Sequence, residues 1–191
     1  MFAGHFGLAA GIKSKVPEVP LWALMVSTQL LDIAFVPMLL GGAETIEETR
    51  PGGGYGEAVI HADYTHSLAG ALLIALLAGL AAWRLWGRRA SGIIAGIVFS
   101  HWLLDLVVHR SDMPLLPGNA MDLPLLGLGA WKSPGLSAVL ELILIVGGLW
   151  LYARSALDKG RGAGRKAAVI SSWVLGCALG LALVTDVTGW F

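Results

Sequence analysis

Charged side chains are scarce in this sequence, and their scarcity excludes most soluble folds. Only 14% of the 191 residues are charged, against roughly 25% in soluble globular domains. Hydrophobic residues make up 56% of the chain, and its mean hydropathy is +0.73. These values predict an integral membrane protein, and the length predicts a single domain over residues 1–191.

The chain also lacks an excess of positive charge and is almost without cysteine. Its formal net charge is zero, and no stretch has the aromatic and basic pattern of a nucleic-acid-binding surface, so nucleic acid is excluded as a partner. The lone Cys177 lies in an apolar run, which excludes a disulfide framework and a thiolate metal site.

Long apolar runs are what the sequence does have. They predict an all-α fold, a polytopic bundle of about five membrane-spanning helices. The first twelve residues would reach only about 18 Å as a helix, too short to span, and are expected to form a re-entrant or half-buried helix. The Pro-rich connection 110–133 is expected to lie on the membrane face and cover a cavity. The five expected spans are residues 20–42, 64–86, 90–109, 135–152 and 167–191.

Basic residues are distributed unequally between the loops. Lys13 and Lys15, the arginines at 84–89 and the basic loop 154–166 fall on one side of a five-span model. The positive-inside rule then predicts an inner (plasma) membrane protein with its N-terminal turn in the cytoplasm and its C-terminus outside.

Ionisable residues inside these apolar runs are the functional candidates. His101, Asp105 and His109 recur at four-residue steps and share one helix face. Insertion of a charged side chain at the bilayer centre costs roughly 2.5–3.5 kcal/mol, so the group needs compensation. A metal ion or a polar cavity would supply it, and so would a His–Asp pair that only joins helices.

Helical rise brings several of these residues to similar depths. From the cytoplasmic end, Asp32 lies at about 18 Å, His101 at about 16 Å and Asp105 at about 22 Å. His5, His66 and Glu141 come from three further segments. Histidine with carboxylate favours zinc, with manganese or iron(II) as alternatives. His109, at about 28 Å, is expected at the outer interface, solvated by water, with an effect on substrate affinity rather than on metal binding.

Four short motifs carry a family resemblance. They are Gly4-His5, Leu31-Asp32, His61-Ala-Asp-Tyr-Thr-His66-Ser67 and Ser100-His101-Trp-Leu-Leu-Asp105. Over about the first 110 residues the chain resembles the YdjM-like membrane-bound metal-dependent hydrolases, which are distantly similar to zinc-dependent phospholipase C and single-strand nucleases. Two positions depart from the family pattern: Ala62 stands where the family has arginine, and Asp32 is followed by Ile33 rather than by a second aspartate.

The hydrolase hypothesis and the resemblance give roles to individual residues. In the hydrolase hypothesis Asp105 would bridge metal ions, and Asp32 or Glu141 would act as general base. His61 would be a further ligand or a catalytic or substrate contact, and His109 and Arg110 would contact substrate. The implied ligands of one to three divalent ions are His5, Asp32, His66, His101 and Asp105.

Three functions fit these features. The favoured one is a membrane-embedded metal-dependent hydrolase acting on a phosphoester of a membrane lipid. The second is a transporter or channel in which His101, Asp105, His109 and Glu141 form an ion or proton path. The third is a structural membrane subunit whose polar groups only pair with one another.

Overall fold

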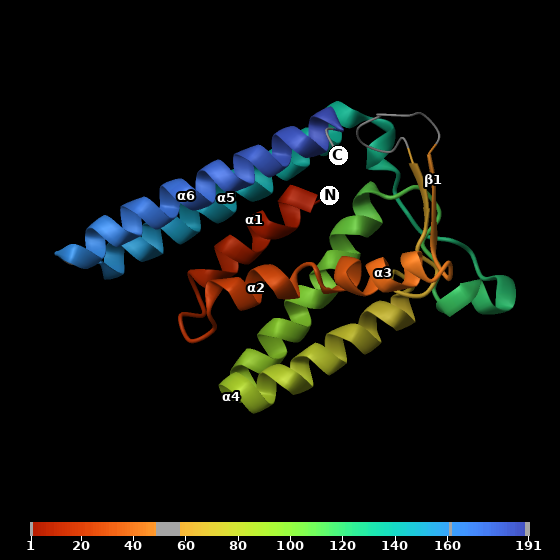
Figure 1. Ribbon diagram of the computed structural model, residues 1–191, viewed down its shortest axis with the longest axis horizontal. Coiled ribbons are helices and arrows are strands. Elements are labelled where there is room, and N and C mark those ends of the chain that lie inside the picture. The colour runs from red at the N-terminus through yellow and green to blue at the C-terminus, as the bar shows by residue number, and fades with distance from the viewer. Residues whose placement is uncertain (1, 49–57, 161, 190–191) are drawn as a thin grey trace.

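The computed structural model describes residues 2–48, 58–160 and 162–189, and it is mostly helical, as the composition predicts. Figure 1 shows its α-helices together with one small β-hairpin. The helices are α1 Phe2–Lys13, α2 Leu21–Ser27, α3 Leu30–Leu40, α4 Leu68–Val108, α5 Pro134–Lys159 and α6 Ala163–Thr188. Two short 3-10 helices, Pro117–Asp122 and Ala130–Lys132, lie in the connection between α4 and α5.

The helix α4 is a hairpin of two legs. Its backbone reverses at Gly87, whose φ of 86° lies in the left-handed region that favours glycine. Beyond this turn the two legs pack closely against each other: a Cβ added at Gly79 would lie 3.0 Å from the Cβ of Ala95. The legs occupy the two ranges that the sequence predicts as separate spans, 64–86 and 90–109, and Figure 1 shows them running side by side in yellow and green.

The number of spans differs from the prediction. Among the described residues, α4, α5 and α6 are long and apolar enough to cross a membrane, and the pair α2–α3 is a fourth candidate bent by 49°. Five spans are therefore not shown: the candidates number three or four, with α4 counted as one helix. The expected span over 20–42 corresponds to the bent pair, which is broken at Thr28 and Gln29 between α2 and α3.

The first helix is short and lies inside the bundle, as the sequence predicts for a half-buried segment. Gly7 and Gly11 are buried and face α5, where a Cβ at Gly7 would lie 2.7 Å from the backbone of Leu144. Small residues four apart allow two helix backbones to pack closely within a membrane. Ala3 also joins Ile145 of α5 and Leu179 of α6 in one apolar cluster, so α1 is held between these helices.

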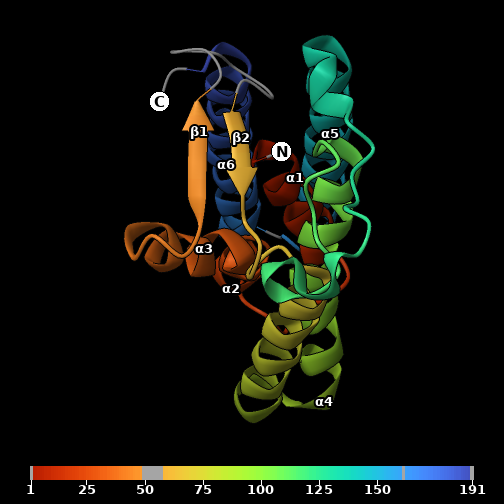
Figure 2. The same cartoon turned by 90° about the vertical axis from the view of Figure 1, so that its right-hand side faces the viewer.

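A β-hairpin, which is not predicted from the sequence, follows α3. Strands β1 Thr45–Glu48 and β2 Ala58–His61 pair antiparallel, with Thr45 opposite His61. Figure 2 shows them side by side above α2 and α3. The hairpin connects α3 to the segment that carries His66, so it belongs to the frame of the site described below.

Candidate metal centre

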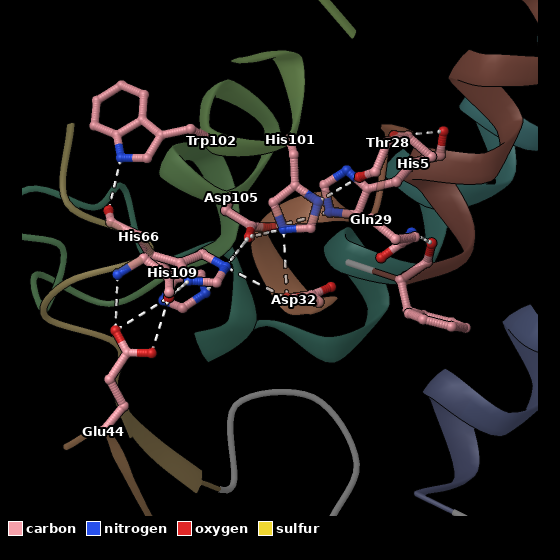
Figure 3. A network of polar contacts seen from close by, with 12 residues as sticks. His5, Thr28, Gln29, Asp32, Glu44, His66, His101, Trp102, Asp105 and His109 are labelled. Carbon is pink, nitrogen blue, oxygen red and sulfur yellow. Dashed lines mark hydrogen bonds and ion pairs between the residues drawn. The ribbon is translucent and has the colours of Figure 1, made fainter. Parts of the chain in front are cut away.

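Six ionisable side chains from four parts of the chain meet in the interior of the protein. We call them the His/Asp centre (Figure 3). α1 and α3 each contribute one residue, the segment before α4 contributes one, and the second leg of α4 and the residue after it contribute three. The members are His5, Asp32, His66, His101, Asp105 and His109.

Four ligand atoms of the centre form short nitrogen–oxygen contacts. His66 Nε2 lies 3.4 Å from Asp32 Oδ1 and 3.7 Å from Asp105 Oδ2. His101 Nε2 lies 3.5 Å and 3.0 Å from the same two oxygens. Atoms bound about 2.0–2.1 Å from a tetrahedral zinc ion lie about 3.3–3.4 Å from one another. The nitrogen–oxygen distances are close to that value, and Asp32, His66 and His101 form a ligand group that could hold a metal ion.

Hydrogen bonding leaves the inward nitrogen of His101 available to a metal. The break between α2 and α3 exposes the carbonyl of Thr28, which lies 2.6 Å from His101 Nδ1. A carbonyl only accepts, so Nδ1 carries a proton, and in the neutral imidazole Nε2 carries the lone pair. That Nε2 is buried and makes no hydrogen bond to any residue that the structure describes. A buried lone pair aimed at two carboxylates is the arrangement that a metal ion satisfies.

His5 approaches Asp105 from the opposite side. Its Nε2 lies 3.1 Å from Asp105 Oδ1, while the other oxygen of that carboxylate faces His101 and His66. The rings of His5 and His101 stack with centroids 3.9 Å apart and planes within 7°. His5, His101 and Asp105 thus form a second ligand group, in which two histidines and one carboxylate would hold a metal ion.

A buried glutamate outside the centre orients His66. Glu44 is 1% exposed, and its Oε1 accepts from the backbone N–H groups of Tyr64 and Thr65 at 2.8 Å each. The Thr65 hydroxyl lies 3.0 Å from both carboxylate oxygens and 2.9 Å from His66 Nδ1. A carboxylate accepts only, so the hydroxyl donates to Glu44 and accepts from Nδ1–H. The lone pair of His66 is thereby left on Nε2, facing Asp32.

The sequence does not indicate a role for Glu44, because this residue lies in an acidic, glycine-rich segment that is typical of a solvent-exposed loop. Its contact with Thr65, 21 residues later in the chain, cannot be derived from the sequence, since the β-hairpin brings the two segments together. The one available signal is the Thr65-His66 pair itself, because a hydroxyl beside a histidine ligand needs an acceptor of its own.

The structure corrects the expected surroundings of His109. This residue is 4% exposed rather than solvated at an interface. Its Nδ1 lies 3.1 Å from Asp112 Oδ1, its Nε2 lies 4.0 Å from Asp105 Oδ2, and its ring packs 4.3 Å from that of Trp131. The Pro-rich connection packs against the end of α4, where the N–H of Gly129 donates to the carbonyl of His109, and it removes His109 from water.

Three other candidates lie away from these contacts. His61 is on β2, 43% exposed, with its Nε2 3.7 Å from Glu47 Oε1. Glu141 of α5 is buried and accepts a hydrogen bond of 2.8 Å from the N–H of Gly4, next to His5 in the chain. Arg110 follows His109 and is half-buried. The structure thus brings Glu141 to the backbone that carries His5 and leaves His61 at the surface.

The fold and the centre together define a class: a polytopic membrane protein with histidines and aspartates gathered among its helices. Residues 1–188 match the model of the family described as YdjM inner membrane protein. The chain belongs to that family, and the match extends the resemblance seen in its first 110 residues to almost its whole length. No curated protein and no solved structure matches it.

Proposed function

We propose that the chain is a membrane-embedded, metal-dependent hydrolase that cleaves a phosphoester of a membrane lipid. The observation that carries this proposal is the pair of ligand groups Asp32–His66–His101 and His5–His101–Asp105. In the first group, hydrogen bonds on the far side of each ring fix the inward nitrogens of His66 and His101. A site of two histidines and two aspartates, without cysteine, favours zinc.

A divalent metal at such a centre supplies a water of pKa about 7 and a positive charge that stabilises the phosphoryl oxygens. In the hydrolysis the oxygen of water forms a bond to phosphorus, and the bond from phosphorus to the alcohol oxygen breaks. The proton released by the water passes to the departing alcohol oxygen. The chain's own groups hold the metal, orient the phosphoester and move that proton.

Asp32 is the residue best placed to move the proton. Its side chain is 42% exposed, while the other five members of the centre are at most 6% exposed. A substrate and its water therefore meet Asp32 first. Glu141, the other expected base, already accepts from the N–H of Gly4, which supports a role in holding α1 in place.

The transporter alternative receives less support. An ion path needs polar groups distributed along the membrane normal. His101, Asp105 and His109 instead meet one another and residues of three other segments within a single centre, and Glu141 contacts backbone. Convergence on one point is the arrangement of a binding centre.

Metal analysis of four proteins tests the proposal. Purified wild-type protein, prepared without chelator, should contain tightly bound divalent metal. His101→Ala should lose it, because His101 belongs to both ligand groups and each would be left with two ligands. His109→Ala should keep the metal bound between His66 and His101, since its Nε2 is the most distant from Asp105. His61→Ala is the matched control, a histidine outside the centre.

Hydrolysis of a phospholipid by the same four proteins completes the test. Activity should be lost in His101→Ala, reduced in His109→Ala and kept in His61→Ala. Well-folded wild-type protein without metal, or equal metal content in His101→Ala and His61→Ala, would contradict the assignment of the centre.

A further inference from the structure

The His/Asp centre has one exposed member, and that residue marks the route of access. Among the six side chains only Asp32 is substantially exposed, at 42%. A molecule that reaches the centre without rearrangement of the helices must pass this carboxylate. The surface beside Asp32 therefore shows which kind of molecule can approach.

That surface is an apolar groove of about 350 Å³ between α1 and the broken pair α2–α3. Asp32 is part of its wall, so the groove borders the exposed member of the centre. Apart from Asp32 and Gln29, the lining side chains are apolar. They include Phe2 and Phe6 of α1, Val26 of α2, and Ile33 and Val36 of α3.

The groove opens toward the outside of the bundle, where lipid surrounds the helices. Val26, Ile33 and Val36 are all exposed, and they flank the groove on a helix pair that is itself a candidate span. A water-soluble ester would find no polar partner along this wall. A hydrocarbon chain that enters from the bilayer exchanges one apolar environment for another, so the groove orients it at little cost.

Gln29 contributes little polar surface to this groove. Its side chain is 5% exposed, and Nε2 donates to the carbonyl of Phe2 at 3.4 Å. Its Oε1 is buried and accepts no hydrogen bond from the described part of the chain. The polar group that an entering molecule meets beside the groove is therefore the carboxylate of Asp32, whose side chain is 42% exposed.

We propose that this groove holds one hydrocarbon chain of the substrate, so that an amphiphilic phosphoester enters the centre laterally from the bilayer. The headgroup lies at Asp32, and the chain lies against Phe2, Phe6, Ile33 and Val36. The proposal rests on the proposed hydrolase function and names its substrate class: a lipid that keeps its acyl chain in the membrane during the reaction.

The first experiment compares two substrates with the same headgroup. Dioleoyl phosphatidylglycerol in detergent micelles has chains that fill the groove, and dibutanoyl phosphatidylglycerol is soluble in water and has chains too short to do so. Val36→Trp places a bulky ring in the groove at an exposed position. It should lower the ratio of kcat/KM for the long-chain over the short-chain substrate by about tenfold or more, because displaced reacting atoms lose rate steeply.

The chain offers a matched control. A second apolar groove of about 410 Å³ lies between α5 and α6, lined in part by Val169 and Trp173 and separate from the His/Asp centre. Val169→Trp makes the same substitution at an exposed valine there and should leave the ratio unchanged. An unchanged ratio in Val36→Trp, or an equal fall in both variants, would overturn the proposal.

A binding measurement separates this proposal from the hydrolase proposal. A phosphatidylglycerol with a photoactivatable acyl chain should label peptides from α2–α3 saturably, and Val36→Trp should abolish saturation. Peptides from α6 should be labelled only in proportion to lipid concentration. Saturable labelling without turnover would remove the hydrolase function and keep the chain site; turnover with unsaturable labelling at α2–α3 would do the reverse.

Discussion

Each histidine of the centre offers one lone pair, and its neighbours decide which nitrogen carries it. The carbonyl of Thr28 fixes the proton of His101 on Nδ1, and the Glu44–Thr65 pair does the same for His66. Both Nε2 atoms then face Asp32 and Asp105. Such outer partners set both the direction and the basicity of a metal ligand.

Glu44 is therefore expected to influence the metal without touching it. Glu44→Gln replaces an acceptor that takes the Thr65 proton by an amide that can also donate, so the Thr65–His66 bond loses its fixed direction. We expect the affinity for metal to fall about 10–100-fold, with the fold retained. Competition with a chelator of known affinity measures this, alongside Glu47→Gln as the control, a glutamate on β1 that is 72% exposed. Equal affinities in the two variants would show that Glu44 has no part in holding His66.

At the scale of elements, the position of α1 decides whether His5 reaches the centre. Gly148 of α5 lies against the carbonyl oxygen of Gly7, and a Cβ there would collide with it. Glu141 of the same helix accepts from the N–H of Gly4. One helix thus fixes α1 both by close packing and by a hydrogen bond beside His5.

Gly148→Ala should consequently displace α1. Overpacking of this kind costs about 1–3 kcal/mol, so we expect a lower temperature of thermal unfolding and weaker binding of metal through His5. Gly147→Ala is the matched control, because a Cβ at Gly147 meets nothing within 4 Å. Both proteins are compared by thermal unfolding in detergent and by metal content. If Gly147→Ala proves as harmful as Gly148→Ala, the contact between α1 and α5 is not the cause.

At the scale of the whole molecule, residues from three basic segments meet at one end of the bundle. The guanidinium of Arg89 donates to the carbonyl of Lys15, and the hydroxyl of Ser155 donates to that of Ser14. Lys15 and Lys159 line one pocket there. The grouping follows the charge asymmetry from which orientation is predicted.

Reporter fusions test that orientation directly. The positive-inside rule predicts the basic loop 154–166 in the cytoplasm and both the 41–62 loop and the C-terminus on the outer face. Alkaline phosphatase fused after residue 191 should be active, and the same reporter inserted at 162 should be inactive. A cytoplasmic C-terminus would mean that the protein has the opposite orientation in the membrane, with the Pro-rich connection 110–133 on the cytosolic side.

Much of the element pattern could be predicted from hydropathy alone, because a long apolar helix is the simplest way to satisfy backbone groups in lipid. The ranges of both legs of α4, of α5 and of α6 follow from that rule. The break at Thr28 and the pairing of β1 with β2 do not, since each is decided by partners distant in the chain. The carbonyl of Thr28, for example, is oriented by its bond to His101.

The sequence by itself determined a membrane protein, mostly helical, with histidines and aspartates at similar depth, because helical rise converts residue number into height. It could not determine which way each side chain points around its helix axis, since that depends on which helix faces pack together. Only the tertiary structure joined Asp32, His66 and His101 into one ligand group, joined His5, His101 and Asp105 into another, and buried His109 beneath the Pro-rich connection. It also left His61 at the surface, turned Glu141 toward α1 and brought Glu44 beside Thr65. The depth of a residue along its helix follows from its position in the sequence, whereas the meeting of residues from several helices depends on how those helices pack.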